Sequence, residues 1–431
     1  MAEPLRLGIA GLGTVGTGVV KIIQKHADVL SKRAGRPLKI VCVSARDRTK
    51  NRDIDISDYD WEEDAVAMAS RDDIDTVVEM IGGSEGLAKE LAEKSLQSGK
   101  NIVTANKALL AHHGFELAKL AEDNGASIGY EAAVAGGIPI IKAMREGFAG
   151  NDMTAVYGIL NGTCNYMLTQ MRETGGDFND ILKEAQEAGY AEADPTFDID
   201  GIDAGHKLAL LSAIAFGTKP DFDSLKIKGI RQIASTDIEY AEEFGYRIKL
   251  LGIARNEGGK LMQVLEPCVV PVSNPLGVIE DVYNAVYVAC DSLETPLLTG
   301  KGAGEGPTAS AVMSDIIDQA RGLKIPTFGI PANDLKDPEW TDLGQTSSRY
   351  YLRLAVLDKP GVIADISAIL RDQHISIEGL VQRGRDPGQE VPIVLTTHET
   401  KHADMLKACE LFKGLDTVVD EPCLMRIEEL E

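Results

Sequence analysis

Four aspartates precede a lysine in the stretch DPTFDIDGIDAGHK, which covers residues 194–207. Such a stretch could bind calcium, form a solvated turn or line an active site. A calcium-binding EF-hand loop needs a glutamate at its twelfth position. Counted from Asp198, the twelfth position is Ala209, and the glycine comes too early. The spacing therefore excludes an EF-hand and leaves a turn or an active site.

The segment after Gly201 predicts a helix, because IDAGHKLALLSAIAF carries apolar residues at helical spacing. Asp203 and Lys207 are four residues apart and share one face of that helix. A carboxylate one turn before a lysine is commonly a surface ion pair. Here the rest of the helix is almost wholly apolar, which favours burial. A buried lysine beside a carboxylate is suited to proton transfer.

A second lysine, Lys107, directly follows an apolar strand in the segment VTANKALL, residues 103–110. Ligands bind at the carboxyl ends of the strands in open α/β sheets, so this position suits a catalytic lysine. A surface lysine at the start of a helix is an equally good interpretation of this feature alone.

Residues 11–16 read GLGTVG, the G-x-G-x-x-G pattern of dinucleotide-binding loops. The first glycine permits a tight turn, and the second lets backbone N–H groups approach a pyrophosphate. The third allows a helix to pack closely on a strand. A purely structural glycine turn is the alternative, but the strand before the loop and the helix after it favour dinucleotide binding. The contacts expected from this loop are Gly11, Gly13, Thr14, Val15 and Gly16.

The end of the second strand, residues 44–50, reads SARDRTK. A site for NAD usually has a carboxylate there, which bonds the ribose 2′-hydroxyl. Arg46 stands where that acid is expected, between Ala45 and Lys50, and cations suit the 2′-phosphate of NADP. We therefore expect NADP or NAD as cofactor, with NADP favoured. Asp47 leaves NAD open, and a solvated basic loop is the alternative to any cofactor contact.

These residues need a scaffold, and the apolar pattern predicts one. Short apolar strands alternate with helical segments over roughly the first 130 residues, which is typical of a doubly wound α/β domain. Longer helices mixed with amphipathic strands follow and indicate an α+β domain. The last 80 or so residues have the order βαββαβ, a ferredoxin-like unit. The strands expected in the first domain are 5–10, 38–44, 75–81, 101–104 and 127–130, and its helices after the glycine loop are 85–98 and 107–123.

The bulk composition excludes several classes of protein. The net charge of −23 argues against binding a nucleic-acid backbone. No apolar run approaches the roughly 20 residues that a membrane span requires, and the first residues lack the cationic start of a signal peptide. The six cysteines are scattered without metal-binding spacing, which points to reduced thiols. We expect a cytoplasmic protein with no nucleic-acid or membrane partner.

Several of these segments together resemble homoserine dehydrogenase. They run in order from about residue 5 to residue 320, and the tail from residue 348 resembles an ACT domain, a small-ligand regulatory module. The matching segments are GLGTVG, TANKALL, YEAAVAGGIPI, LNGTCNYML, GYAEADPTFDIDGIDAGHKLALL and GKGAGEGPTASAVMSDI, followed in the tail by DKPGVIADISAILRDQHISIEG.

The resemblance implies boundaries for the domains. The expected order is a Rossmann-type nucleotide domain, a catalytic and dimerisation domain, a linker rich in proline and small polar residues, and the ACT domain. The ranges are 1–131 (completed by about 305–325), 132–304, 326–347 and 348–431.

The resemblance also implies an activity, the NAD(P)-dependent interconversion of L-aspartate 4-semialdehyde and L-homoserine on the route to threonine and methionine. Lys207 is then the principal acid/base, with Lys107 beside it polarising the same oxygen or relaying the proton. Glu192 would bind the ammonium group of the substrate, and Asp203 would orient the substrate or Lys207.

Three further acids and one glycine in this region are expected to have less direct roles. Asp198 aligns with an aspartate of the family, and Gly189 is a plausible backbone contact to cofactor or substrate. Asp194 and Asp200 are expected to shape and cap the turn.

Two glycine-rich segments gain a function only through the resemblance. YEAAVAGGIPI wraps a monovalent cation, usually sodium, in the family, largely through main-chain oxygens; a plain connection between domains is the alternative. GKGAGEGPTASAV would return a second glycine loop, with Gly302 and Gly304, to the cofactor. The cation positions are Glu131, Val134, Gly136 and Ile138. The full set of expected cofactor contacts is Gly11, Gly13, Thr14, Val15, Gly16, Ala45, Arg46, Lys50, Thr104, Lys107 and Gly304.

The ACT-like tail suggests feedback control by an amino acid. Its loop Asp358-Lys-Pro-Gly361 corresponds to the loop that meets an effector, with threonine the favoured effector, although such a domain can instead serve assembly. We expect a homodimer or a homotetramer.

Two other functions fit parts of the sequence. Another dehydrogenase of a small amino-acid-derived aldehyde would share the scaffold, but the set of Glu192, Asp203 and Lys207 argues against it. A non-catalytic NAD(P)-binding amino-acid sensor would be expected to lack a catalytic lysine, whereas both lysines are present. The length leads us to expect no additional aspartate kinase module.

Overall fold

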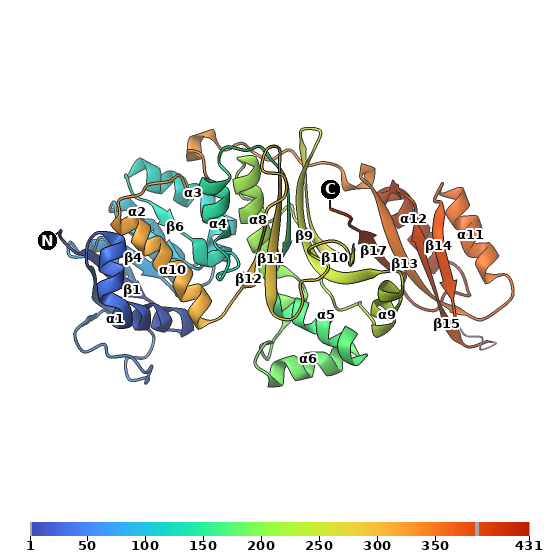
Figure 1. The fold of residues 1–431 in the computed structure, drawn as a ribbon, viewed down its shortest axis with the longest axis horizontal. Helices are drawn as coiled ribbons and strands as arrows, with labels where there is room; N and C mark the ends of the chain where they lie inside the picture. The colour runs from blue at the N-terminus through green and yellow to red at the C-terminus, as the bar shows by residue number, and fades with distance from the viewer. Residues whose placement is uncertain (1, 384–387, 431) are drawn as a thin grey trace.

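In the computed structural model, which describes residues 2–383 and 388–430, the chain forms three units in a row (Figure 1). The N-terminal unit lies at one end, the unit that carries the longest strands lies in the middle, and the C-terminal unit lies at the other end. Within the described ranges no helix is both long and apolar enough to cross a membrane.

The N-terminal unit is built on a six-stranded sheet in which every neighbouring pair is parallel. The strand order 3-2-1-4-5-6 reverses between β1 and β4, and a ligand is expected at such a switch point. The doubly wound fold predicted from the sequence is confirmed. In sheet order the strands are β3 (Asp60–Trp61), β2 (Leu38–Ser44), β1 (Leu5–Ala10), β4 (Thr76–Glu79), β5 (Asn101–Thr104) and β6 (Ile128–Gly129).

Helices cover both faces of this sheet. One apolar core joins α1 (Thr14–Ala34) and α10 (Glu305–Ala320) to the sheet, and another joins α2 (Leu87–Gln97) and α3 (Lys107–Asp123) to its opposite face. The chain therefore returns to the first unit after forming the second. Helices α1 and α10 approach closely at Gly18, since a Cβ there would lie 3.0 Å from the Cβ of Ala309.

The middle unit packs helices against the strands β7, β9, β10, β11 and β12. Helix α8 (Ile202–Phe216) is the centre of this packing, because residues 203–214 are all buried. A helix that is apolar on all sides is expected inside a core. The strands are β7 (Met153–Ile159), β8 (Lys226–Ile227), β9 (Tyr246–Glu257), β10 (Lys260–Pro271), β11 (Tyr283–Cys290) and β12 (Leu297–Lys301); the other helices are α4 (Ile140–Lys142), α5 (Gly162–Thr174), α6 (Phe178–Glu187), α7 (Thr196–Ile199) and α9 (Ser235–Glu243).

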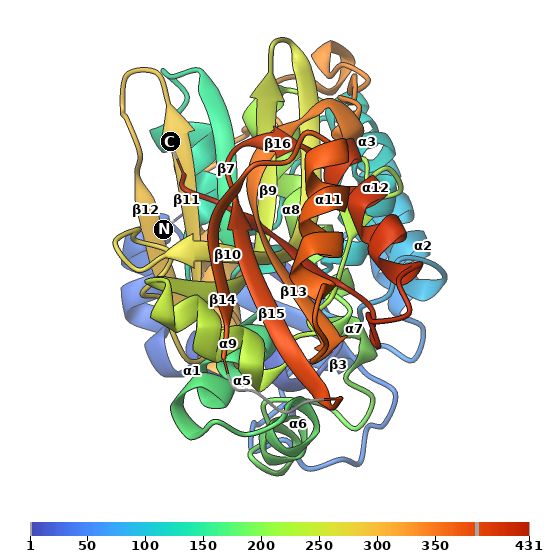
Figure 2. The same ribbon diagram turned by 90° about the vertical axis from the view of Figure 1, so that its right-hand side faces the viewer.

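The C-terminal unit has the predicted βαββαβ order, and its sheet continues that of the middle unit. Strand β17 pairs in parallel with β10 and antiparallel with β13, so that one sheet runs in the order β12-β11-β7-β9-β10-β17-β13-β15-β14. Figure 2 shows β14, β15 and β13 nearest the viewer, with α11 and α12 beside them. The elements are β13 (Ser347–Leu357), α11 (Val362–Asp372), β14 (Ile377–Gln382), β15 (Glu390–Thr397), β16 (Thr400–Lys401), α12 (His402–Lys413) and β17 (Cys423–Ile427).

Buried charges fix the C-terminal unit to the middle unit. Asp237 of α9 is fully buried and accepts hydrogen bonds from Arg353 Nε at 2.7 Å and from the Tyr351 hydroxyl at 3.1 Å, both on β13. Arg426 of β17 donates to Glu266 of β10 at 2.9 Å. A buried charge without a partner is costly, so these pairs favour one relative position of the two units.

Two segments differ from the sequence prediction. The last strand, expected from the sequence over residues 417–427, begins at Cys423, because the polar run DEP interrupts it; Val418 makes an isolated bridge to Val356. The segment 326–347, expected to be a linker, is packed on the protein and enters β13 at Ser347. Phe328 is 1% exposed, and the indole of Trp340 donates to Asp221 at 2.9 Å.

Candidate active site

The two lysines singled out from the sequence meet at one carboxylate. Lys207 and Asp203 lie one turn apart on α8, with Lys207 Nζ 2.7 Å from Asp203 Oδ2. Lys107, the first residue of α3, places its Nζ 3.1 Å from Asp203 Oδ1. Asp203 therefore bridges a helix of the middle unit and a helix of the nucleotide unit.

Asn161 holds the acids of this cluster in place. It precedes α5 and caps that helix by accepting a hydrogen bond from the Cys164 N–H. Its own amide NH₂ group donates hydrogen bonds to two carboxylates. Its Nδ2 lies 2.8 Å from Asp198 Oδ1 and 2.9 Å from Asp203 Oδ2. One amide thus determines the distance between the acid on the short helix α7 and the acid on α8.

The two carboxylates have opposite pKa shifts. Burial alone would raise the pKa of Asp203, but Lys207 and Lys107 outweigh it and hold that pKa well below its usual range. Burial, and then the charge of Asp203, raise the pKa of Asp198. Next to them, burial lowers the pKa of His206 to about 4, so this side chain adds no charge at neutral pH. Two ammonium groups therefore face one firmly ionised carboxylate.

Lys207 keeps part of its hydrogen-bonding capacity. An ammonium group has three N–H donors, and Lys207 directs two of them to the Leu160 carbonyl and to Asp203, each at 2.7 Å. Lys207 is only 8% exposed and lines a cavity of about 630 Å³. The third donor is available to an oxygen atom of a ligand in that cavity.

The cavity collects residues from distant parts of the sequence. It lies between the two units and includes the glycine loop, both lysines and the segment 189–192. The sequence-predicted residues that line it are Thr14, Val15, Lys107, Gly189, Glu192, Asp198, Asp203, Lys207 and Gly304.

Glu192 lies on the open side of this cavity. Gly189, with φ +77°, turns the chain after α6, and Glu192 follows as an exposed residue of the loop before α7. Its backbone carbonyl accepts a hydrogen bond from Gln186 Nε2 at 3.0 Å. Among the residues that the structure describes, its carboxylate has no hydrogen-bond or ion-pair partner. It is therefore available to a cation in the cavity.

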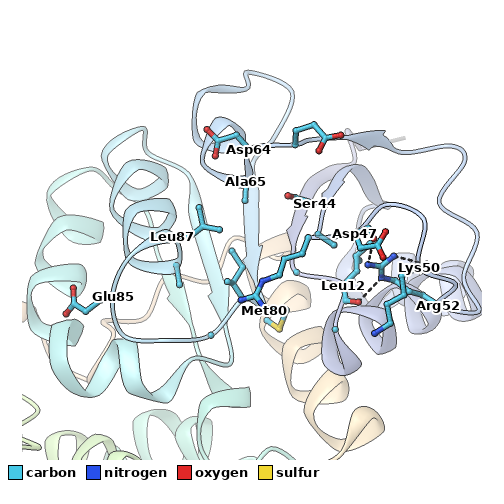
Figure 3. Close-up of a pocket in the computed structure, with 18 residues that line it drawn as sticks. Leu12, Ser44, Asp47, Lys50, Arg52, Asp64, Ala65, Met80, Glu85 and Leu87 are labelled. Carbon is cyan, nitrogen blue, oxygen red and sulfur yellow. Dashed lines mark hydrogen bonds between the residues drawn. The ribbon is translucent and has the colours of Figure 1, made fainter.

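A second cavity, of about 680 Å³, adjoins the glycine loop in the nucleotide unit (Figure 3). Gly11 has φ +104°, and a Cβ on it would lie 2.4 Å from the carbonyl oxygen of Met80. A Cβ on Gly13, in contrast, would meet nothing within 4 Å, so this side of the loop is open to a ligand. Helix α1 begins directly after Gly13, and the N-terminus of a helix favours phosphate. These residues fit the diphosphate of a dinucleotide.

The wall of this cavity beyond β2 is basic. Ala45, Arg46 and Lys50, which the sequence led us to expect as cofactor contacts, line it. Arg48 instead packs over the ring of Trp61, 5.6 Å from its centroid. The shape of this wall depends on Arg52, which sequence analysis had not singled out.

Arg52 ties the basic wall to the glycine loop, and Figure 3 shows it between Leu12, Asp47 and Lys50. Its guanidinium donates to three backbone carbonyls, those of Leu12 at 3.0 Å, Lys50 at 2.8 Å and Asp47 at 2.6 Å. Nothing in the sequence indicated this role, because the acceptors are main-chain atoms with no side-chain pattern.

Thr104 lies behind the cavity wall rather than in it. It is 1% exposed, and its hydroxyl donates to Glu79 at 2.6 Å. Glu79 in turn accepts from the N–H groups of Ile81 and Gly82, which line the second cavity. The geometry thus gives Thr104 a supporting place behind the wall, and the direct cofactor contact expected from the sequence stays a prediction.

The segment expected to wrap a cation is pinned between the two units. The N–H of Gly136 donates to the Gly302 carbonyl, and the N–H of Gly137 donates to the Lys301 carbonyl, both at 2.9 Å. Ala135 has φ +47°, which few residues other than glycine adopt. Its strain implies that the surrounding contacts enforce the turn.

The side chain of Glu131 in this segment serves the fold. It is 1% exposed, and its carboxylate accepts from the N–H groups of Ile141 and Lys142, each at 2.9 Å. Burial, and then the nearby Asp315, raise the pKa of Glu131 to about 7. Across 2–383 and 388–430, no three His, Cys, Asp or Glu side chains are grouped as metal ligands. Any cation here would depend on main-chain carbonyls.

Comparison with known protein families agrees with this architecture. The family model described as "Homoserine dehydrogenase" matches residues 139–317, "Homoserine dehydrogenase, NAD binding domain" matches residues 11–131, and "ACT domain" matches residues 350–413.

Individual proteins match over nearly the whole chain. A protein of Neisseria gonorrhoeae named homoserine dehydrogenase is 43% identical, and the match covers 99% of each chain. The crystal structure of a homoserine dehydrogenase from Thiobacillus denitrificans superposes with a TM-score of 0.93 at 40% identity and covers 100% of both chains. A hyperthermophilic archaeal homoserine dehydrogenase mutant, solved in complex with NADPH, has a TM-score of 0.64 at 27% identity, covering 75% of this chain and 99% of its own.

Proposed function

The chain belongs to the homoserine dehydrogenase family and is an NAD(P)-dependent oxidoreductase of that activity, and from this premise we propose which of its residues carry the reaction. The reaction interconverts L-aspartate 4-semialdehyde and L-homoserine. Its chemical step moves a hydride to or from the substrate carbon and a proton to or from the substrate oxygen. When bound, the nicotinamide cofactor exchanges the hydride.

Lys207 holds the proton that the substrate oxygen exchanges. Its two donors to Leu160 and Asp203 fix the ammonium group, and the third is directed to the oxygen. In the reductive direction the oxygen gains negative charge as hydride arrives, and Lys207 gives it a proton. Lys107, on the other side of Asp203, adds a second positive charge near the same oxygen. Charges fixed in advance stabilise such a transition state most effectively.

Two carboxylates have distinct tasks in this proposal. Asp203 stays ionised, holds both lysines and keeps them from separating. Glu192 binds the ammonium group of the substrate, because its carboxylate lies at the cavity without an assigned protein partner among the described residues. Asp198, whose pKa is raised, shapes the pocket through Asn161 and Thr163.

NADP is the favoured cofactor in this proposal. Arg46 and Lys50 line the wall where the ribose 2′-position of a bound dinucleotide would lie. The hydrogen bonds of Arg52 to backbone carbonyls set the position of that wall. The archaeal relative named above is described in complex with NADPH. Charge-assisted bonds to a 2′-phosphate would outweigh the loss of an acidic partner for the ribose hydroxyl.

A monovalent cation, an effector and an oligomer complete the proposal. Sodium would bind the main-chain oxygens of Glu131, Val134, Gly136 and Ile138, in the loop that Ala135 bends. Threonine would act at the tail near Asp358-Lys-Pro-Gly361, and the enzyme would work in the cytoplasm as a homodimer or homotetramer. All six cysteines are buried free thiols, which suits a reducing compartment.

The observation that carries the assignment of roles is the shared carboxylate: two lysines from different units meet at Asp203. The test is a spectrophotometric assay of homoserine oxidation with NAD and NADP in parallel, with and without threonine. Lys207→Ala should lose most of the turnover, about 100-fold or more, and still bind cofactor. Lys183→Ala, which removes an exposed lysine paired with Glu187 on α6, is the matched control and should leave turnover unchanged.

Near-normal kcat in Lys207→Ala would refute the acid/base assignment. Equal kcat/KM for NAD and NADP would refute the cofactor preference, and an activity unaffected by threonine would remove threonine as the effector. Sodium should raise the melting temperature of the wild type more than an equal concentration of choline does. An equal effect of the two salts would argue against the cation site.

A further inference from the structure

Asn284 carries a buried amide at the edge of the catalytic cavity. It lies on β11, is 1% exposed, and is among the residues that line the cavity shared by Lys107 and Lys207. Among the residues that the structure describes, neither its Nδ2 nor its Oδ1 has a hydrogen-bond partner. An amide buried in this way costs free energy, and such groups in native proteins are usually satisfied by a ligand or by water.

Glycines form the immediate surroundings of this amide. A Cβ on Gly302 would lie 2.2 Å from Asn284 Oδ1 and 2.6 Å from its Nδ2, so the side chain packs directly on the glycine loop. On another side, a Cβ on Gly162 at the start of α5 would lie 3.5 Å from Oδ1. Only glycine at 302 leaves room for the amide.

The loop that covers Asn284 also adjoins the cofactor loop. Gly302, Ala303 and Gly304 line the cavity together with Thr14 and Val15 of the first glycine loop. A dinucleotide whose diphosphate lies at Gly13 extends its second half into this cavity, toward the two lysines. The amide of Asn284 is thus at the nicotinamide end of the expected ligand.

The chemistry of an asparagine amide selects among the groups that could reach it. It offers one carbonyl acceptor and an NH₂ donor and carries no charge. The substrate's ammonium and carboxylate are charged groups, which charged side chains bind more strongly. The carboxamide on the nicotinamide ring is neutral and has the complementary donor and acceptor.

We propose that Asn284 binds the carboxamide of the nicotinamide ring and thereby sets the orientation of the ring for hydride transfer. Its Nδ2 donates to the carboxamide oxygen and its Oδ1 accepts from the carboxamide NH₂. The loop 302–304 covers the amide, so the proposed contact requires this loop to move and the backbone hydrogen bond from Gly136 to Gly302 to yield when the cofactor binds. Asn284 is a positioning residue for the reaction, and this assignment rests on the cofactor placement proposed above.

The test compares cofactor binding with and without the nicotinamide ring. Dissociation constants of NAD and ADP-ribose, and of NADP and 2′-phospho-ADP-ribose, are measured by calorimetry for the wild type and for Asn284→Ala. The ratio between each pair isolates the contribution of the nicotinamide half. Loss of two neutral hydrogen bonds should reduce that ratio about 10-fold and leave the affinity for the truncated ligands unchanged. The same variant should no longer distinguish NAD from its 3-acetylpyridine analogue, which lacks the carboxamide NH₂.

Thermal unfolding of the free protein separates this role from a structural one. Asn284→Ala removes no protein hydrogen bond, so its melting temperature without cofactor should stay close to that of the wild type. The matched control is Asn274→Ala, because Asn274 is also buried but bonds the Leu276 N–H at 2.9 Å and the Glu429 carbonyl at 3.2 Å. The control should melt at a lower temperature and keep the full ligand ratio. If Asn284→Ala folds poorly, Asn284→Leu fills the same space and serves as the second variant.

Each result decides between explanations. An unchanged ligand ratio in both Asn284 variants would overturn the proposal and leave the amide with a water or a substrate group, which a raised homoserine KM would identify. Equal weakening of full and truncated ligands would also overturn it, because that pattern indicates a general defect of the site. If the wild type itself binds none of the four ligands, the proposed cofactor site fails, whatever Asn284 does.

Discussion

Replacing Asp203 with asparagine removes the charge that holds the two lysines together and keeps the shape of the side chain. In the structure Asp203 lies 2.7 Å from Lys207 Nζ and 3.1 Å from Lys107 Nζ. Asn161 can still donate to the one remaining carbonyl oxygen. The substitution therefore tests electrostatics with little change in packing.

The size of the effect follows from these distances. Two unit charges about 3 Å apart attract by about 5 kcal/mol at the effective dielectric constant of about 20 that suits protein sites. Desolvation of the charges offsets part of this attraction. A hydrogen bond to a charged group contributes about 2 kcal/mol net, which corresponds to about 30-fold in rate.

The expected effect is a loss of turnover. Asparagine carries no charge, so in Asp203→Asn the two ammonium groups repel each other with no carboxylate between them. The kcat of homoserine oxidation should therefore fall about 30-fold to 100-fold, because the lysines are no longer held in position.

The assay is homoserine oxidation followed by absorbance over a range of pH, with cofactor binding and thermal unfolding measured on the same samples. Asp200→Asn is the matched control, because Asp200 lies in the same segment but pairs with Arg231 at the surface, 2.5 Å from Nε. The control should keep the kcat of the wild type. If Asp203→Asn raises the homoserine KM and leaves kcat unchanged, Asp203 binds substrate instead of organising the lysines, and the reasoning above is wrong.

Three further outcomes follow from other parts of the structure. Arg46→Ala should raise the KM for NADP about 10-fold or more and change the KM for NAD little; equal changes in steady-state assays would remove Arg46 from the 2′-phosphate site. Glu131, whose pKa burial raises from 4.5 to about 7, should give stability that is complete below about pH 4.5 and is lost as the pH rises through 7. Glu131→Gln should abolish that loss, about 3 kcal/mol in sodium-free urea titrations at pH 5 and 8, and a slope that persists would place the titration elsewhere. Arg426→Met should destabilise the protein by about 3 kcal/mol because it leaves Glu266 unpaired; the double variant with Glu266→Gln should recover part of this loss in the same measurement, and no recovery would mean that the pair is not coupled.

Local patterns were enough to predict much of the fold. The loop GLGTVG identified the nucleotide unit, since its glycines are required for local steric reasons. The structure shows a close backbone approach at Gly11 and open space at Gly13. The tail was recognisable by its order of strands and helices. In both cases residues near each other in the sequence impose the structure, so that periodicity and turn chemistry carry the information.

The joining of the middle and C-terminal units could not be predicted in this way. Strand β17 pairs with β10 through only the registers Cys268 with Arg426 and Val269 with Ile427. Neither segment carries a pattern that specifies the other, because backbone pairing is nearly independent of side-chain identity. The packing of the segment 326–347 could not be predicted for a related reason: its prolines are typical of a linker, while Phe328 and Trp340 anchor it through contacts more than 100 residues away.

In the candidate site too, local features could be predicted from the sequence and long-range contacts could not. Asp203 and Lys207 were paired from their spacing alone, because one helix carries both, but their meeting with Lys107 depends on how two units pack. Asn284 shows most clearly what could not be predicted from the sequence alone. In the sequence it is one polar residue in the strand YNAVYVAC, where it would be expected to face water or a strand neighbour. The structure instead buries it against a glycine more than a dozen residues later, at the cavity that holds both lysines. A buried amide with no protein partner is a property of the folded site as a whole, and it is on such atoms that a structure adds to what motifs already indicate about catalysis.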